Sequence, residues 1–105
     1  MVKKIDAAEF HELLKRDEQV VVKFGAAWCG PCKVMTRQLE ECEGEVFEIN
    51  IDEDFELAAS LGIKTIPRLK VFKSGQLIRE HVGIFSTVDD AFRFVHDKQT
   101  TRWRD

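Results

Sequence analysis

The chain has 105 residues, of which 44% are hydrophobic and 33% are charged, and its formal net charge at pH 7 is −3. This length predicts a single domain over residues 1–105, and the composition is ordinary for a globular protein with a real core. The negative charge gives no electrostatic reason to expect binding to nucleic acid or to a membrane surface, and neither a signal peptide nor a membrane span is predicted.

The N-terminal half is predicted to alternate strands and helices. Residues 2–5 form a short strand, and Asp6 caps a helix that has one apolar face. Residues 20–24 are almost continuously apolar, as in a strand that is covered on both faces. A second helix begins at Pro31 and ends at Gly44. The apolar faces comprise Ala7, Phe10, Leu13 and Leu14 in the first helix, and Met35, Leu39 and Cys42 in the second.

The C-terminal half continues this alternation and adds a hairpin. An interior strand over 46–51 leads to a short helix capped by Asp52 or Asp54. Two further strands are joined by a turn of sequence KSGQ, and Ser86 or Thr87 caps the last helix. These strands span 69–72 and 77–82, and the inward residues are Leu57, Ala58 and Leu61 in the short helix and Val88, Ala91, Phe92 and Val95 in the last one.

The predicted order of elements is β-α-β-α-β-α-β-β-α. Strands that alternate with helices imply parallel pairs joined by crossovers, and the late hairpin adds an antiparallel edge. The predicted fold class is therefore α/β, with a central mixed five-stranded sheet flanked by four helices on both faces.

The strongest chemical signal is the run WCGPC, from Trp28 to Cys32, directly after the strand at 20–24. Pro31 suits the first turn of a helix, because its missing N–H would have no partner there. Cys29 then lies at the helix N-terminus, where unpaired N–H groups and the helix dipole favour a thiolate. The thiolate is the nucleophile of thiol–disulfide exchange, and Cys32, about one turn on, is close enough to resolve a mixed disulfide.

Two other interpretations of the cysteine pair stay open. A CxxC pair can be half of a zinc site, but such a site usually needs four Cys or His ligands at close spacings, and this chain offers only Cys42 and three scattered histidines. We therefore expect no metal and no other cofactor. The pair can also be a purely structural disulfide, which the Gly-Pro insert disfavours. Three cysteines without an export signal indicate a cytoplasmic protein.

Two further features have plain structural explanations. The helical spacing of Cys42 from Met35 and Leu39 predicts a core thiol, with a regulatory thiol as the alternative. Residues 98–105 are predicted to be the solvated end of the last helix, with a partner contact through Trp103 as the alternative.

With these features the chain resembles the thioredoxins over nearly its whole length. The motifs that carry the resemblance are WCGPCK from Trp28, NID from Asn50, GI at Gly62, IP at Ile66, FKSG from Phe72 and VG at Val82. The resemblance implies the thioredoxin fold, reduction of protein disulfides and recycling by a thioredoxin reductase. The expected partners are that reductase and disulfide-containing proteins, and the protein is expected to be a monomer.

The same resemblance implies roles for individual residues. Cys29 is the attacking thiol and Cys32 the resolving one. Pro67 matches the family's cis-proline, which lies against the dithiol, and the backbone of Ile66 would hydrogen-bond an extended substrate segment. The substrate-binding rim would comprise Trp28, Gly30, Pro31, Ile66, Pro67, Arg68 and Gly83, although Trp28 can also be a packing residue.

Three of the positions that depart from the family's usual pattern bear on the site. Lys23 stands where thioredoxins usually carry a buried Asp, and Glu48 stands where they usually carry a Lys. Because neighbours on parallel strands can face each other when their parity matches, we expect Lys23 and Glu48 to pair and to act in catalysis. The alternative is that both side chains point to solvent. Arg68, after Pro67, would place a cation near the dithiol.

Three functions are compatible with these residues. The first is a general protein-disulfide reductase, an enzyme that carries electrons on its dithiol. The second is a more oxidising thiol–disulfide oxidoreductase with a dedicated partner, which the cations Lys23 and Arg68 favour. The third is a binding module recruited by a larger protein, with an incidental dithiol.

Overall fold

The computed structural model describes residues 1–98, and in this part of the chain the elements follow the predicted order. The strands are β1 (Val2–Lys4), β2 (Val20–Gly25), β3 (Val46–Asn50), β4 (Arg68–Lys73) and β5 (Gln76–Val82). The helices are α1 (Ala7–Leu13), α2 (Gly30–Glu40), α3 (Phe55–Ser60) and α4 (Val88–His96). The predicted α/β class, a mixed five-stranded sheet with helices on both faces, is confirmed.

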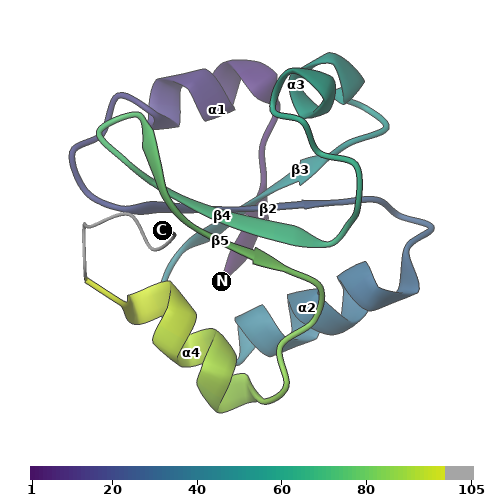
Figure 1. Ribbon diagram of the computed structural model, residues 1–105, viewed down its shortest axis with the longest axis vertical. Helices are drawn as coiled ribbons and strands as arrows, with labels where there is room; N and C mark the ends of the chain where they lie inside the picture. Colours follow the sequence, from purple (N-terminus) through teal and green to yellow (C-terminus); the bar gives the residue numbers. More distant parts are fainter. Residues whose placement is uncertain (99–105) are drawn as a thin grey trace.

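The sheet has the strand order β1-β3-β2-β4-β5. The pairs β1–β3 and β3–β2 are parallel, whereas β2–β4 and β4–β5 are antiparallel. Helices α1 and α3 cover one face of the sheet, and α2 and α4 cover the other (Figure 1). Strand β2 is therefore central and buried along its whole length, and it leads into α2 at one edge of the sheet.

Local signals in the sequence explain where several elements begin. The Asp6 carboxylate accepts a hydrogen bond from the Glu9 N–H at 2.9 Å, and the Glu9 carboxylate accepts one from the Asp6 N–H at 3.0 Å, which completes a capping box for α1. The Thr87 hydroxyl accepts from the Asp90 N–H at the start of α4. The β4–β5 turn has positive φ at Ser74 and Gly75, as a two-residue hairpin turn requires.

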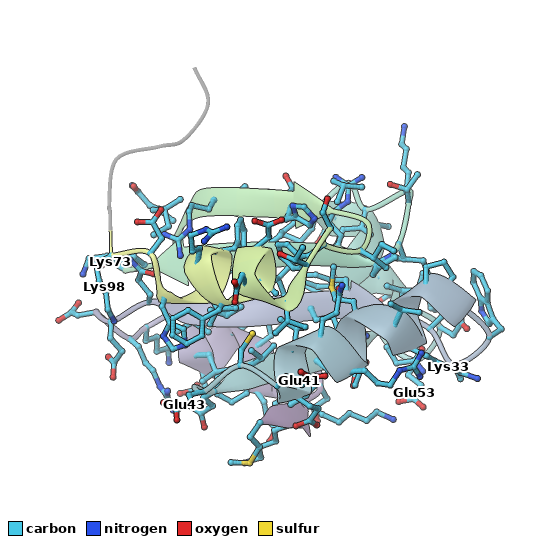
Figure 2. All side chains as sticks on the ribbon, turned by 90° about the horizontal axis from the view of Figure 1, so that it is seen from below. Lys33, Glu41, Glu43, Glu53, Lys73 and Lys98 are labelled. Carbon is cyan, nitrogen blue, oxygen red and sulfur yellow. A yellow bond between two sulfur atoms is a disulfide. The ribbon has the colours of Figure 1, made fainter. Side chains whose placement is uncertain are left out.

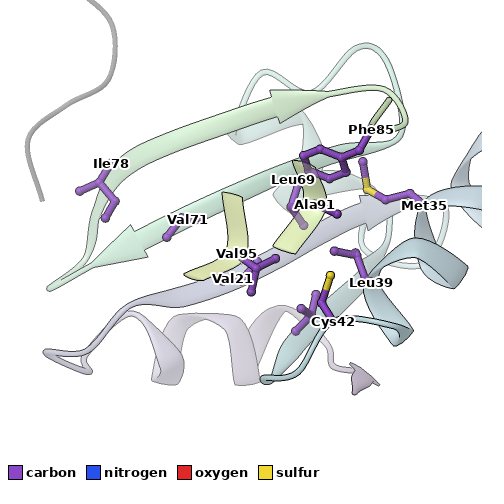
Figure 3. Packing of buried hydrophobic residues seen from close by; sticks show 11 residues of the cluster. Val21, Met35, Leu39, Cys42, Leu69, Val71, Ile78, Phe85, Ala91 and Val95 are labelled. Carbon is purple, nitrogen blue, oxygen red and sulfur yellow. The ribbon is translucent and has the colours of Figure 1, made fainter. Parts of the chain in front are cut away.

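The core lies on both faces of the sheet because alternate side chains of β2 point to opposite sides. Val21 belongs to the cluster beneath α2 and α4, whereas Val22 and Phe24 belong to the cluster beneath α1 and α3. Figure 3 shows the first cluster, in which Leu69 and Val71 of β4 meet side chains from both helices. The same alternation carries Lys23, between Val22 and Phe24, to the α2 side.

Two sequence-based predictions about the helices are wrong. Helix α2 ends at Glu40, so Gly44 does not end it, and Cys42 enters the core from the turn that follows the helix. Phe92, predicted to face inward, is 45% exposed, because Ala91 and Val95 occupy the buried stripe of α4 one turn apart. The prediction for residues 98–105, including Trp103, concerns a segment of which all but Lys98 lies outside the described residues.

Within residues 1–98, no helix has the length and apolar character that crossing a membrane would require.

Candidate active site

The cysteine pair lies where β2 passes into α2. Cys29 and Cys32 form a disulfide, with their Cα atoms 5.3 Å apart. Cys29 is the N-cap residue of α2, and its Sγ accepts a hydrogen bond from the Cys32 N–H at 3.1 Å. Gly30 and Pro31, between the two buried cysteines, are exposed. The free N–H groups of the first helical turn are thus available to stabilise negative charge on the Cys29 sulfur.

Trp28 directly precedes Cys29 in the chain and is 70% exposed. Its Nε1–H donates a hydrogen bond to Asp52 Oδ2 at 2.8 Å, and the Asn50 side chain in turn accepts from the Asp52 N–H at 2.8 Å. Asp52 therefore holds an exposed aromatic ring in place. Asp52 was predicted as a candidate helix cap and belongs to the NID motif of the family resemblance, but the N-cap position is that of Asp54. The sequence feature that could have indicated its bond to Trp28 is the position of this acidic residue just after β3, the neighbour of β2.

The loop before β4 completes the edge of the site. The Ile66–Pro67 bond is cis, and Ile66 packs against a small cluster that contains both active-site cysteines. The Gly83 N–H donates to the Pro67 carbonyl at 2.9 Å, which joins this loop to the end of β5. Val82 and Ile84, on either side of Gly83, are 51% and 48% exposed. Exposed apolar side chains therefore flank the residue that is hydrogen-bonded to this loop.

Arg68 does not project freely from the predicted rim. Its Nη1 lies 2.9 Å from Glu80 Oε2, and its remaining guanidinium nitrogens donate to the backbone and side chain of Thr65. Lys70 lies 3.5 Å from the same Glu80 oxygen. The predicted cation is therefore near the loop, but it belongs to a group of two cations and one carboxylate.

Lys23 and Glu48 form the predicted pair. They are direct neighbours in the parallel β2–β3 register, and Lys23 Nζ lies 2.6 Å from Glu48 Oε2. The Lys23 side chain is 1% exposed, whereas that of Glu48 is 31% exposed. This burial contradicts the alternative that both side chains point to solvent. A lysine this deeply buried is tolerated when a carboxylate compensates its charge.

Gly25 brings this pair close to the disulfide. A Cβ atom at residue 25 would lie 3.0 Å from Lys23 Nζ and 3.1 Å from Cys32 Sγ. The ammonium and the sulfur thus both border the small space that a side chain at residue 25 would fill. A cavity of about 220 Å³ adjoins them and is also lined by Glu48, Lys33 and Lys4. Gly25 is not among the site residues predicted from the sequence.

Cys42 is a core residue, as its spacing predicted. It is 3% exposed, and its Sγ lies 3.4 Å from the Gln38 carbonyl oxygen. Burial raises the pKa of the Cys42 thiol, and the neighbouring Glu41 raises it further. A thiol that stays protonated is a poor nucleophile.

Replacing Cys42 by alanine is expected to leave disulfide-reductase turnover unchanged and to lower the free energy of unfolding by about 1 kcal/mol, the cost of deleting a methyl-sized group from a packed core. Denaturant unfolding and a turnover assay on the same preparation check both parts. A large loss of turnover in a folded Cys42→Ala protein would instead favour the regulatory role.

Among the described residues, no group of three or more His, Cys, Asp or Glu side chains is arranged to hold a metal ion.

Comparison with known proteins identifies a matching family model, relatives of similar sequence and solved structures of similar fold. The family model described as Thioredoxin matches residues 1–96. The Thioredoxin of Alicyclobacillus acidocaldarius is 38% identical over 82 residues, covering 72% of this chain and 78% of the relative. Thioredoxin-1 of Schizosaccharomyces pombe is 35% identical over 89 residues, covering 79% and 86%. The solved structure of Malassezia sympodialis thioredoxin superposes with a TM-score of 0.76 at 30% identity, covering 91% of this chain and 90% of that one.

Proposed function

The chain belongs to the thioredoxin family, and from that premise we propose that it reduces disulfide bonds of other proteins and is recycled by a thioredoxin reductase. Its activity is thiol–disulfide oxidoreduction. The observation that carries the proposal is the closed Cys29–Cys32 pair at the N-terminus of α2.

The reaction follows from the positions of the two sulfurs. In the reduced protein the Cys29 thiolate attacks a substrate disulfide, forms a mixed disulfide and releases one substrate thiolate. The Cys32 sulfur then attacks Cys29, forms the Cys29–Cys32 bond and releases the second substrate thiolate. The substrate gains two electrons and the dithiol loses them. The reductase returns two electrons to reopen the bond.

In this proposal a substrate segment lies in extended form along the substrate-binding rim. Trp28, Gly30 and Pro31 would bound one side, and the loop of Ile66 and Pro67 with Gly83 the other. The exposure of Trp28, Val82 and Ile84 supports this placement, since exposed apolar rims mark binding surfaces. The Ile66 backbone would form hydrogen bonds to the substrate main chain.

We assign the reaction to a monomer acting as one domain over residues 1–105, because one chain supplies both cysteines and both sides of the rim. We place it in the cytoplasm, because the free thiol of Cys42 and a dithiol that works by being reduced suit a reducing compartment.

The test is a coupled assay in which NADPH and a thioredoxin reductase supply electrons and a protein with an accessible disulfide accepts them. Sustained NADPH oxidation that requires both this protein and the disulfide substrate is expected. If dithiothreitol supports substrate reduction but no reductase does, the oxidoreductase activity stands and the proposed recycling by a thioredoxin reductase is wrong. Absence of turnover with both electron donors would favour the binding module.

Arg68 is expected to give a modest preference for acidic substrate segments, because the group of Arg68, Lys70 and Glu80 carries one net positive charge beside the loop. Arg68→Thr should lower the ratio of rates on matched acidic and basic disulfide peptides by about threefold at low salt, the size of a partly exposed ion-pair effect. High salt should reduce the difference between the two proteins.

Lys73→Thr is the matched control, because Lys73 ends the same strand at the opposite end of the molecule from Lys33 beside the active site (Figure 2). Equal acidic-to-basic ratios in wild type and Arg68→Thr would show that Glu80 fully compensates Arg68.

A further inference from the structure

A buried ammonium with few partners lies beneath the resolving cysteine. Lys23 Nζ has three N–H donors, and within residues 1–98 the recorded acceptor for them is Glu48 Oε2, at 2.6 Å. The Cys32 sulfur lies close by, because Lys23 Nζ and Cys32 Sγ are 3.0 and 3.1 Å from the position that a Cβ at residue 25 would take. In the disulfide this sulfur is neutral and a weak acceptor. When the disulfide opens, it can become a thiolate, which is a strong acceptor beside a cation.

We propose that Lys23 serves two anions in turn: Glu48 while Cys32 is in a disulfide or protonated, and the Cys32 thiolate during resolution, when Glu48 holds the proton. This deepens the proposed function and rests on it. Lys23 then acts on the reaction through Cys32, as the residue that positions a charge beside its sulfur, and Glu48 is the proton acceptor.

The balance of charge explains why such an exchange suits a buried site. The proton leaves Cys32 Sγ and reaches the Glu48 carboxylate across the cavity, so the group Lys23, Glu48 and Cys32 keeps the same total charge. Moving charge within a buried group avoids the desolvation cost of creating a lone ion there. The thiolate then attacks the Cys29 sulfur of the mixed disulfide, and the substrate sulfur leaves with the electron pair. Glu48, which is 31% exposed, finally releases the proton to solvent.

Other charged groups at the cavity are placed to contribute less. Lys33 of α2 is exposed, so solvent screens its charge. Lys4 of β1 is exposed and paired with Glu53 at 2.7 Å. The Cys29 sulfur accepts a hydrogen bond from the Cys32 N–H at the helix N-terminus. The charges that are both buried and close to Cys32 are therefore those of Lys23 and, in part, Glu48.

The test is the equilibrium of the dithiol with reduced and oxidised glutathione in the full-length protein. Lys23→Met should shift the equilibrium toward the protein disulfide by at least tenfold, which is about 30 mV for a two-electron couple. Glu48→Gln should shift it the opposite way, because it leaves the cation uncompensated beside the thiolate. Opposite signs are the signature of the proposal, since loss of packing alone would not give them.

The Cys32 thiol provides a second measurement. In the Cys29→Ser background, ultraviolet thiolate absorbance should show a higher Cys32 pKa with Lys23→Met and a lower one with Glu48→Gln. Cys42 does not interfere, because burial raises the pKa of its thiol.

The matched control is Lys70→Met. Lys70 is also a buried lysine paired with a glutamate, but it follows Leu69, the register partner of Lys23, and so faces the other side of the sheet. It should leave the glutathione equilibrium unchanged. If a single variant does not fold, Lys23→Met with Glu48→Gln leaves no unpaired charge, and it should shift the equilibrium as Lys23→Met does, by less.

Unchanged equilibria in the Lys23 variants, shifts of the same sign in Lys23→Met and Glu48→Gln, or an equal shift in Lys70→Met would overturn the inference. A wild-type protein that forms no reversible Cys29–Cys32 disulfide with glutathione would instead reject the proposed function itself.

Discussion

Replacing Cys29 by serine is expected to reduce disulfide-reductase turnover to the uncatalysed background. Cys29 is the N-cap residue of α2, and its sulfur accepts a hydrogen bond from the Cys32 N–H, whereas Cys32 lies one turn inside the helix. The N-cap position is the one at which the helix N-terminus stabilises a thiolate. The coupled assay with NADPH and a reductase measures the loss, and turnover close to wild type would assign the attack to another residue.

Cys32→Ser is expected to abolish turnover in a different way. Attack by Cys29 still forms the mixed disulfide, but no second sulfur can release the substrate. The variant should therefore accumulate covalent complexes that dithiothreitol dissolves, and mass spectrometry should find them on Cys29. The double variant Cys29→Ser with Cys32→Ser is the control and should trap nothing. Complexes formed through Cys42 in that control would contradict its place as a buried, protonated thiol.

Lys23→Asp is expected to lower the free energy of unfolding by about 3–5 kcal/mol, the usual cost of breaking a buried ion pair by changing one partner. The substitution sets a carboxylate beside Glu48 in a site where the present side chain is 1% exposed. Denaturant unfolding at neutral pH measures the change. Lys73→Asp, the same substitution at the far end of β4, should cost much less.

The double exchange Lys23→Asp with Glu48→Lys is expected to recover most of that loss, because the β2–β3 register keeps the two positions adjacent whichever charge each carries. The double-mutant cycle isolates the coupling between them. Additive effects of the two single substitutions would show that the pair contributes no interaction energy.

Repeating patterns explain why most of the fold could be predicted. Periods of two and 3.6 residues identify strands and helices, and Asp6, Thr87 and the KSGQ turn mark where elements begin or reverse. The end of α2 was misplaced because an apolar residue in a turn can fall on the same spacing as a helix face. Cys42 does so, although the helix ends at Glu40. Phe92 was predicted to face inward because it is hydrophobic, but it lies on the exposed face of α4, so hydrophobicity alone does not show which face a residue occupies.

The site was predictable where its residues are close in sequence or related by strand parity. The cysteine pair needed only the motif, and the pairing of Lys23 with Glu48 needed only adjacent parallel strands. The partner of Arg68 could not be deduced, because it depends on the register of a hairpin that contains an irregularity between Val71 and Phe72. The bond from Trp28 to Asp52 depends on the path of a turn.

Because Gly25 has no side chain, the Lys23 ammonium and the Cys32 sulfur can both lie close to its Cα. A Cβ at this residue would lie 3.0 Å from Lys23 Nζ and 3.1 Å from Cys32 Sγ, which is closer than most Cβ contacts, so the lysine or cysteine side chain would have to shift. If Lys23 acts on Cys32 as proposed, a substitution at Gly25 would change the reduction potential of the dithiol without changing any charged residue. The size of residue 25 would then be a means, in evolution or in engineering, of setting the reduction potential of the Cys29–Cys32 pair.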